Sequence, residues 1–421
     1  MSPGERRLLA LPRFADRADA YRPGLERMEA MLAALGDPHR AVPSIHVAGT
    51  NGKGSTSSLA ASVVGATGRR VGLHTSPHLL TLRERMRVDG EPASSAWLDA
   101  AVDRWAETLD RVGPSFFEAT VALSLLHFAE QAVDLAVVEV GLGGRLDATN
   151  VLTPEASVVT HVGLDHTDLL GETPQAIARE KAGIAKPGVP LLHAVTGPAR
   201  PALEAEALRR GAPVEAVRQS CRVTDGLATP VADYGPVEIG LTGAHQRWNA
   251  ALAVRAVETA SARLGWTLPA AAVQAGLAEV AARTGLQGRG QPWAADPRVI
   301  LDVAHNADGW RAALDALPPG GRLWVLAGVL ADKDAGALGD ALAERDATVW
   351  ALGLEGDRAL SADALAAVLG RRQRVEPVET AAEALDAFAR AAGPADRLLV
   401  TGSHQTVAAV LAARTRRAST G

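Results

Sequence analysis

The chain has 421 residues, of which 47% are hydrophobic and 22% charged, a balance typical of globular rather than disordered proteins. Its length allows two domains with sizeable cores. The net charge of −5 gives no electrostatic reason to expect a nucleic acid or an anionic membrane as partner. A single cysteine, Cys221, excludes an internal disulfide and a thiolate metal cluster. No signal peptide and no apolar run of the roughly 20 residues that span a bilayer is found, so we expect a soluble, cytoplasmic protein.

The first part of the chain predicts strands that alternate with helices. Residues 44–48 (SIHVA) form a short apolar run that leads into the glycine-rich stretch GTNGKGS, and apolar residues at helical spacing follow as far as Gly68. RRVGLHTS, LAVVEVG and ASVVTHVGL are further predicted strands, and residues 116–130 are a predicted helix, whereas TSPHLLTLRERMRVDGE is a polar stretch. This alternation predicts an α/β fold with a doubly wound, mostly parallel sheet and ligands at the carboxyl ends of its strands.

A second domain is predicted after residues 284–298 (TGLQGRGQPWAADPR), where glycines and prolines interrupt the pattern. Beyond this segment, RVILDVAHN, RLWVLAGVL, ATVWALGL and DRLLVTGS are strand-like and are separated by alanine-rich helical stretches. We therefore expect a domain over residues 1–285 and a smaller, Rossmann-like α/β domain over residues 286–421.

The stretch GTNGKGS is similar to a phosphate-binding loop but departs from it at two positions. An ordinary loop reads G-x-x-x-x-G-K-[ST], with a metal-binding hydroxyl directly after the lysine. Here Gly54 follows Lys53, and Val47 stands in the place of the first glycine. Glycines still allow backbone N–H groups to converge on phosphate oxygens at a helix N-terminus, so we expect a nucleotide site rather than a plain turn. Its candidate residues are Gly49, Thr50, Asn51, Gly52, Lys53, Gly54 and Ser55.

Polar residues at other strand ends are candidates for metal binding. Glu139 ends an otherwise apolar strand, and His166 lies in GLDHTD after another. Each could also be structural, as a solvated strand end or a satisfied histidine. Zinc is the less suitable ion because no thiolate is present, and Mg²⁺ with oxygen ligands suits a nucleotide site better. Lys181 and Lys186 in AREKAGIAKPG could simply be solvated.

The second domain carries its own cluster of polar residues at a strand end. Asp302, His305 and Asn306 in LDVAHN indicate a second ligand surface. The weaker companions are LADKDAG and the TGS segment that contains Ser403, each of which alone would be a turn.

These segments resemble, in order, the folylpolyglutamate synthase and dihydrofolate synthase branch of the Mur ligase superfamily. The motifs are GTNGKGS, TSPHL, RERMRVDGE, FFEAT, VEVGLGGRLDATN, GLDHTDLLG, REKAGI, GAHQRWNAALA, DVAHN, LADKDAG and TGS, over roughly residues 45–403. The resemblance implies an ATP-dependent amide ligase. ATP phosphorylates a substrate carboxylate, the amine of L-glutamate attacks the acyl phosphate, and ADP and phosphate leave.

The resemblance also implies roles for individual residues. A first Mg²⁺ would be held by Ser76, Glu139 and His166, and a carbamylated Lys181 would bind a second. Asn249, Arg289, Asp302 and His305 match positions that contact ATP, with Arg289 in the linker between the domains so that binding would couple to closure. Phe117 and Asp147 match positions that hold a pterin ring, although Phe117 could equally be a helix core residue. The implied catalytic residues are Lys53, Lys181 and His305, and Ser403 is a substrate-binding candidate.

Two departures from the family pattern bear on specificity: LRER lacks an asparagine before its ER pair, and His404 replaces an apolar or aromatic residue. We expect a dihydrofolate synthase, with or without further glutamate addition to folates, that acts as a monomer on dihydropteroate or a reduced folate. A cell-wall Mur ligase would carry a further N-terminal domain, and only about 40 residues precede the phosphate-loop strand. A nucleotide-hydrolysing switch without ligase activity would leave the DVAHN cluster unexplained.

Overall fold

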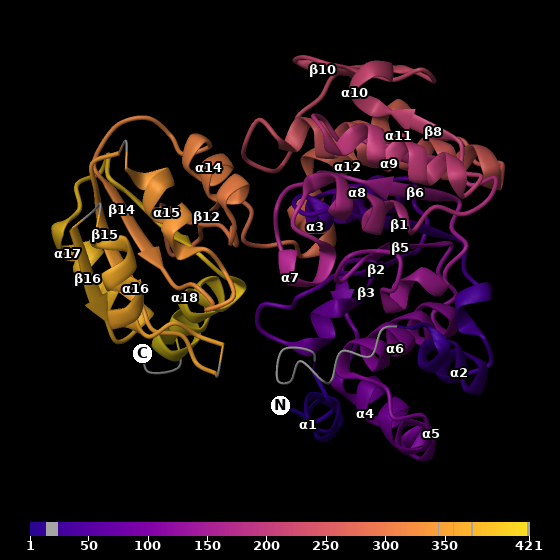
Figure 1. Ribbon diagram of the computed structural model, residues 1–421, viewed down its shortest axis with the longest axis horizontal. Coiled ribbons are helices and arrows are strands. Elements are labelled where there is room, and N and C mark those ends of the chain that lie inside the picture. The colour runs from indigo at the N-terminus through magenta and orange to yellow at the C-terminus, as the bar shows by residue number, and fades with distance from the viewer. Residues whose placement is uncertain (14–23, 344, 357, 372–373, 419–421) are drawn as a thin grey trace. The chain divides into compact units, whose positions relative to one another are not determined.

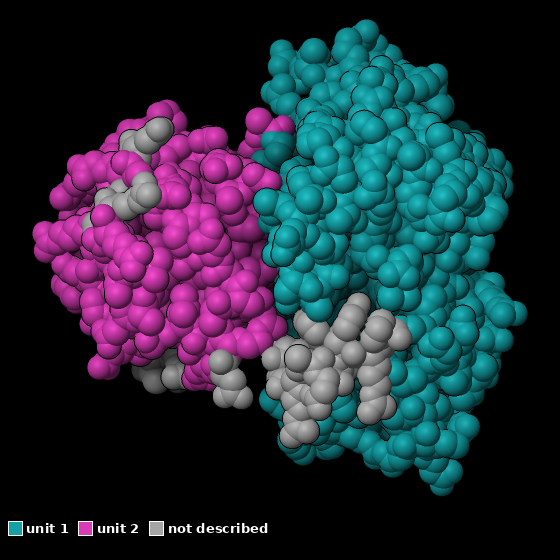
Figure 2. All heavy atoms as spheres, in the orientation of Figure 1, with its two compact units in different colours: residues 1–240, 245–286 teal, residues 241–244, 287–421 magenta. Residues whose placement is uncertain are grey.

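The computed structural model describes residues 1–13, 24–343, 345–356, 358–371 and 374–418, and the chain divides into two compact units (Figure 2). Unit 1 comprises Met1–Gly240 and His245–Leu286, and unit 2 comprises Leu241–Ala244 and Gln287–Gly421. Among the described residues no helix is long and apolar enough to cross a membrane.

Unit 1 is built on an eight-stranded sheet in the order β4-β3-β2-β5-β1-β6-β7-β8 (Figure 1). All neighbours are parallel except β3 and β4 at one edge. Because β1 lies between β5 and β6, the segments that follow these three strands meet at one edge of the sheet. The strands are β1 (Ser44–Ala48), β2 (Val71–His74), β3 (Met86–Val88), β4 (Glu91–Pro92), β5 (Leu135–Glu139), β6 (Ala156–Val159), β7 (Leu191–His193) and β8 (Val214–Ala216).

Helices cover both faces of this sheet, as expected for a doubly wound fold (Figure 1). Helix α3 (Lys53–Ala66) packs on α11 (Gln246–Leu264), α12 (Ala270–Ala278) and α13 (Val280–Thr284). Helix α6 (Phe116–Glu130) belongs to a core on the other face of the sheet, which also includes Val138 of β5. In the sheet, Val138 pairs in register with His46 of β1. The remaining helices of unit 1 are α1 (Pro3–Leu9), α2 (Glu26–Ala34), α4 (Ser95–Arg104), α5 (Ala106–Val112), α7 (Thr167–Leu170), α8 (Pro174–Ala182), α9 (Ala199–Arg209), α10 (Val217–Ser220) and the 3₁₀ turns η2 (Pro38–Arg40), η3 (Leu82–Arg85) and η4 (Ala148–Val151).

The predicted strands and helices of unit 1 are confirmed, and α6 has the bounds expected from the sequence. The stretch interpreted only as polar, residues 75–91, contains η3 and the strand β3, which pairs with β2 and β4. Not predicted were β7, β8 and a separate three-stranded antiparallel sheet of β9 (Arg222–Val223), β10 (Gly226–Ala228) and β11 (Asp233–Pro236). Strands of two to four residues are too short to show an alternating pattern.

Helices α3 and α12 approach closely enough to require a glycine. A Cβ on Gly276 would lie 2.5 Å from Val63 Cα, and Ser62 Oγ donates to the Gly276 carbonyl at 2.6 Å. We expect Gly276→Ala to lower the free energy of unfolding by about 1–3 kcal/mol, because the added methyl group pushes the helices apart. Chemical denaturation measures this loss. The matched control is Gly65→Ala on α3, whose Cβ would meet only Val71 Cγ1, at 3.7 Å, and which should be neutral or stabilising.

Unit 2 has a six-stranded sheet in the order β12-β13-β17-β14-β15-β16, parallel except for β12. The four predicted strands are present, but β13 starts within the segment that was expected to break the pattern, where it forms a hairpin with β12. The strands are β12 (Gln291–Trp293), β13 (Asp296–Leu301), β14 (Leu323–Ala327), β15 (Ala347–Leu352), β16 (Arg374–Val378) and β17 (Arg397–Thr401), and the helices are α14 (Ala307–Asp315), α15 (Ala335–Leu342), α16 (Ala362–Leu369), α17 (Ala381–Ala391) and α18 (His404–Ala418).

Candidate functional site

The phosphate-loop candidate joins β1 to α3 and depends on two glycines. A Cβ on Gly49 would lie 1.9 Å from Thr160 Oγ1, and a Cβ on Gly52, whose φ is +87°, would lie 2.7 Å from Asn249 Oδ1. Thr160 Oγ1 also donates to the carbonyl of Asn51 at 2.7 Å. The loop is therefore packed against the segment after β6 and against the first turn of α11. Gly52 is the N-cap of α3, so Lys53 begins the helix and Gly54 and Ser55 are buried in its first turn.

Two lysines converge on the same carbonyl of this loop. Lys53 Nζ donates to the carbonyls of Gly49 and Thr50 at 3.2 Å each, and Lys181 Nζ donates to the Gly49 carbonyl at 3.0 Å. Burial, together with the charge of Lys53, lowers the pKa of Lys181 to about 7. A substantial fraction of Lys181 is therefore a neutral, nucleophilic amine near neutral pH.

The end of β5 brings together a carboxylate and the predicted serine. Glu139 is only 3% exposed and accepts a hydrogen bond from the backbone N–H of Ser76 at 3.2 Å. Arg85 is close enough for its charge to interact with that carboxylate, although burial lowers the pKa of this guanidinium to about 10. Within the described part of the chain, Arg85 donates a side-chain hydrogen bond through Nε alone, to His78 Nδ1 at 2.9 Å.

Arg85 was missed in the sequence because it lies in a stretch interpreted as polar. Arg85 is the second arginine of RERMR. It is the last residue of η3 and directly precedes β3. A buried guanidinium is stabilised by a nearby anion, and the carboxylate of Glu139 supplies a favourable charge here.

The loop that carries His166 is bound to the phosphate loop. Thr50 N donates to the His161 carbonyl at 2.6 Å, and Thr50 Oγ1 accepts from Gly163 N at 3.1 Å. His166 is the N-cap residue of α7 with φ of 50°, and its Nε2 lies 3.8 Å from Asp165 Oδ1. No group of three or more His, Cys, Asp or Glu side chains in the described ranges is arranged to hold a metal ion. The candidate set Ser76, Glu139 and His166 is not a group of that kind, because a serine hydroxyl would be one of its ligands. The hydroxyl and carboxylate oxygens of this set suit Mg²⁺.

Phe117 and Asp147 both border the start of the segment after β5. The ring of Phe117 lies on the backbone of Gly141, where a Cβ would approach Phe117 Cζ to 2.4 Å. The carboxylate of Asp147 accepts from Leu142 N at 2.9 Å and from both the backbone N–H and the hydroxyl of Thr149. Burial raises the pKa of Asp147, and these hydrogen bonds oppose that shift. The ring of Phe117, from α6, and the carboxylate of Asp147 are thus both held against the segment after β5.

Asn249 is fixed at the start of α11 beside the phosphate loop. Its Nδ2 donates to Gln246 Oε1 at 2.9 Å, and its Oδ1 is the atom that a side chain at Gly52 would strike. Asn249 therefore contacts the turn in which a nucleotide phosphate would lie.

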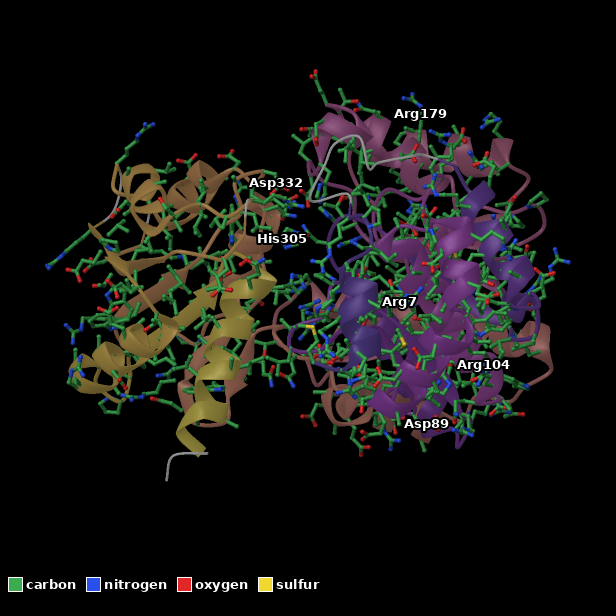
Figure 3. All side chains as sticks on the ribbon, turned by 90° about the horizontal axis from the view of Figure 1, so that it is seen from below. Arg7, Asp89, Arg104, Arg179, His305 and Asp332 are labelled. Atoms are coloured by element: carbon green, nitrogen blue, oxygen red, sulfur yellow. The ribbon has the colours of Figure 1, made fainter. Side chains whose placement is uncertain are left out.

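The unit 2 candidates follow β13 and β17. Asp302 accepts from Gly290 N at 2.8 Å and from Ala304 N at 2.9 Å; burial raises the pKa of this carboxyl, and the positive charge of Arg289 opposes the shift. His305 Nδ1 lies 3.0 Å from the Val303 carbonyl, so this nitrogen carries the proton (Figure 3).

The residues after β17 also have structural contacts. Ser403 Oγ accepts from Thr406 N at 3.1 Å and caps α18, while the ring of His404 lies 6.1 Å from that of His305. Asn306 similarly caps α14, by accepting from Gly309 N at 3.0 Å. The hydroxyl of Ser403 therefore already accepts a hydrogen bond from the first turn of α18. The proximity of His305 and His404 was not predicted from the sequence.

Comparisons with known proteins show which family the chain belongs to. Residues 47–257 match the Mur ligase middle domain, and residues 288–404 match the Mur ligase glutamate ligase domain. The chain is 36% identical to the dihydrofolate synthase/folylpolyglutamate synthase of Escherichia coli, over 94% of this chain and 93% of the relative. It is 39% identical to a probable bifunctional folylpolyglutamate synthase/dihydropteroate synthase of Halobacterium salinarum, over 97% of this chain but only 51% of that relative, so it spans about half of that protein's length.

Solved structures match along the whole chain. E. coli FolC in complex with DHPP and ADP superposes with a TM-score of 0.87 at 32% identity and covers 99% of each chain. The Yersinia pestis bifunctional folylpolyglutamate synthase/dihydrofolate synthase complexed with AMPPNP and Mn ion gives 0.86 at 28% identity, over 97% of each chain.

Proposed function

Because the chain belongs to the folylpolyglutamate synthase/dihydrofolate synthase family of Mur ligases, we propose that it is an ATP-dependent ligase that joins L-glutamate to dihydropteroate, to reduced folates, or to both. The observation that carries this proposal is the cluster at the edge of the unit 1 sheet. There a phosphate loop with two converging lysines adjoins a buried carboxylate, Glu139, and a buried guanidinium, Arg85. This charge pattern suits a reaction that transfers a phosphoryl group to a carboxylate.

The reaction divides into two displacements. A carboxylate oxygen of the acceptor attacks the γ-phosphorus of ATP, and ADP departs, which leaves an acyl phosphate. The amine of L-glutamate then attacks the acyl carbon, the C–O bond to phosphate breaks, and the amine loses a proton. In this scheme Lys53 and the N-terminus of α3 neutralise the phosphates, and Arg85 pairs with the anionic acceptor carboxylate or acyl phosphate. Asn249, Arg289, Asp302 and His305 contact ATP, and Ser403 contacts a substrate.

We assign the metal ligands as Ser76, Glu139 and His166 for a first Mg²⁺ ion. Bound there, Mg²⁺ would offset negative charge on the phosphates. A second ion would need a further anionic ligand, and Lys181 supplies one if it is carbamylated. Its neutral amine attacks CO₂, forms an N–C bond and releases a proton, which converts a buried cation into an anionic oxygen ligand. The pKa of about 7 supports this step, because only the unprotonated amine reacts.

The carbamylation proposal predicts chemical rescue. Lys181→Ala should lower kcat by roughly a hundredfold or more, because an anionic ligand is lost. Short-chain carboxylic acids should restore part of the activity by placing a carboxylate in the space left by the side chain. The measurement is ADP release against acetate or propionate concentration, with chloride at equal ionic strength as control. A variant that stays inactive at every acid concentration, or is already as active as the wild type, would refute this role.

For the acceptor, we propose that Phe117 stacks on the pterin ring and that Asp147 accepts hydrogen bonds from its ring N–H groups. The packing of Phe117 on Gly141 and the hydrogen bond from Leu142 N to Asp147 support this assignment, because both side chains contact the same segment. A monomer is sufficient for every step proposed here.

The proposed function is tested by coupled measurement of ADP release. L-Glutamate is supplied first with dihydropteroate and then with tetrahydrofolate, which separates dihydrofolate synthase from folylpolyglutamate synthase activity. ADP release that requires both glutamate and one of these acceptors supports the proposal. No turnover with either acceptor would overturn it. Release independent of glutamate would indicate a nucleotide-hydrolysing switch, and release only with a UDP-sugar acceptor a cell-wall ligase.

A further inference from the structure

A buried histidine lies behind the candidate pterin carboxylate. His46, in the central strand β1, has no exposed surface, and its Nε2 lies 2.8 Å from Thr149 Oγ1. Thr149 is likewise fully buried, and its Oγ1 lies 2.5 Å from Asp147 Oδ1. The three side chains form a continuous chain of hydrogen bonds from the sheet to the loop after β5. Neither periodicity nor motif spacing connects them, because His46 and Thr149 are 103 residues apart.

The protons in this chain can be assigned by counting donors. Burial lowers the pKa of His46 to about 3, so the ring is neutral and carries one N–H. Both oxygens of Asp147 act as acceptors, Oδ2 from Leu142 N and Oδ1 from Thr149 N, so the short contact to Oδ1 uses the single hydroxyl proton of Thr149. His46 must then donate its Nε2–H to the Thr149 oxygen.

The unpartnered nitrogen of His46 supports the same direction. Its Nδ1 is buried and has no hydrogen-bond partner among the described residues. In the assigned tautomer Nδ1 is unprotonated and carries a lone pair. In the reversed arrangement, with a protonated Asp147 and Thr149 donating to His46, it would be a buried N–H without an acceptor. Orphaned donors are the rarer and costlier case in folded proteins.

We propose that His46 is a positioning residue for acceptor binding: its Nε2–H fixes the Thr149 hydroxyl so that it donates to Asp147 Oδ1 and orients the carboxylate for the substrate. The proposal deepens, and rests on, the assignment of Asp147 to the pterin ring. Oδ1 accepts two hydrogen bonds from Thr149, so Oδ2, which accepts from Leu142 N, is the oxygen that we assign to a ring N–H of the substrate. This relay of His46, Thr149 and Asp147 does not include Lys53 or Lys181. Its loss should therefore weaken binding of the acceptor and not of ATP.

Two pairs of variants test the relay by steady-state kinetics. His46→Met and Thr149→Val remove the donor at each step, whereas His46→Gln and Thr149→Ser are matched controls that keep an N–H or a hydroxyl. We expect the His46→Met and Thr149→Val variants to raise the KM for dihydropteroate roughly tenfold, which corresponds to the loss of one hydrogen bond to a charged group. The KM for ATP should stay within about twofold, and Gln and Ser should recover most of the acceptor affinity. An unchanged acceptor KM in Met and Val, or equal damage to the ATP KM, would overturn the proposal.

A second measurement does not depend on turnover and so separates the relay from the proposed function. Long-range ¹H–¹⁵N spectra of protein labelled at its 11 histidines report ring tautomers, and the signal lost in His46→Gln identifies His46. The relay predicts a neutral Nε2–H tautomer at pH 7 that changes in Thr149→Val. An Nδ1–H tautomer or an imidazolium in the wild type would refute the relay, even if the enzyme ligates glutamate. The predicted tautomer together with no turnover would instead refute the proposed function alone.

Discussion

Replacing Lys53 with alanine should abolish phosphoryl transfer, with a fall in kcat of roughly a thousandfold or more. Lys53 is the first residue of α3, and its ammonium binds the Gly49 and Thr50 carbonyls of the phosphate loop. When phosphates enter, this ammonium is the mobile charge able to leave those carbonyls and neutralise the transferring group. Loss of the charge should therefore act on the transition state as well as on nucleotide binding, which ADP release under saturating substrates measures.

The matched control lies beyond the other end of the same helix. Arg69→Ala also removes a cation, but its guanidinium packs on Trp266 and bonds Thr67 Oγ1. That variant should keep near-wild-type turnover. Circular dichroism and thermal unfolding establish that both variants fold. Wild-type-like turnover in folded Lys53→Ala would refute the assignment of the phosphate loop.

Glu139→Gln should lose Mg²⁺-dependent activity while the protein remains folded. The amide oxygen of glutamine can still accept from Ser76 N, so the local hydrogen bond is retained. The buried negative charge is lost, however, and with it the proposed metal ligand and the countercharge to Arg85. We expect kcat to fall by roughly a hundredfold or more and the Mg²⁺ concentration for half-maximal activity to rise.

A Mg²⁺ titration of ADP release tests this prediction. Glu130→Gln, which removes a surface carboxylate paired with Arg104, is the control and should leave the titration unchanged (Figure 3). If Glu139→Gln shows the same Mg²⁺ dependence and turnover as the wild type, Glu139 is not a metal ligand.

Much of the fold follows from the sequence, because long periodic segments carry their own signal. The helix over residues 116–130 has apolar positions throughout and a capping box at Ser115, and it was predicted with its observed bounds. The central strands were equally clear from their apolar runs. The three-stranded sheet of unit 1 was not, because β9, with two residues, and β10, with three, cannot display a period.

The site was predicted less completely, because its contacts join distant segments. Glu139 and Ser76 were expected together through family resemblance, and the structure places Ser76 N on the Glu139 carboxylate. The convergence of Lys181 on the Gly49 carbonyl spans 132 residues and could not come from spacing. Arg85 was not singled out within its polar stretch, and only the folded structure shows that it is buried. Burial and long-range contact are properties of the folded chain that local patterns do not contain.

Transfer of oxygen from the acceptor to phosphate shows whether this chain activates a carboxylate as an acyl phosphate. Dihydropteroate labelled with ¹⁸O in its carboxylate is incubated with the wild-type protein, ATP, Mg²⁺ and L-glutamate, and the inorganic phosphate is analysed by mass spectrometry. We expect one ¹⁸O atom in each phosphate released, and as many labelled phosphates as amide products, because a carboxylate oxygen leaves with the phosphoryl group. Released phosphate without ¹⁸O, whose fourth oxygen comes from water, would contradict this mechanism, since ATP would then be hydrolysed without activation of the acceptor.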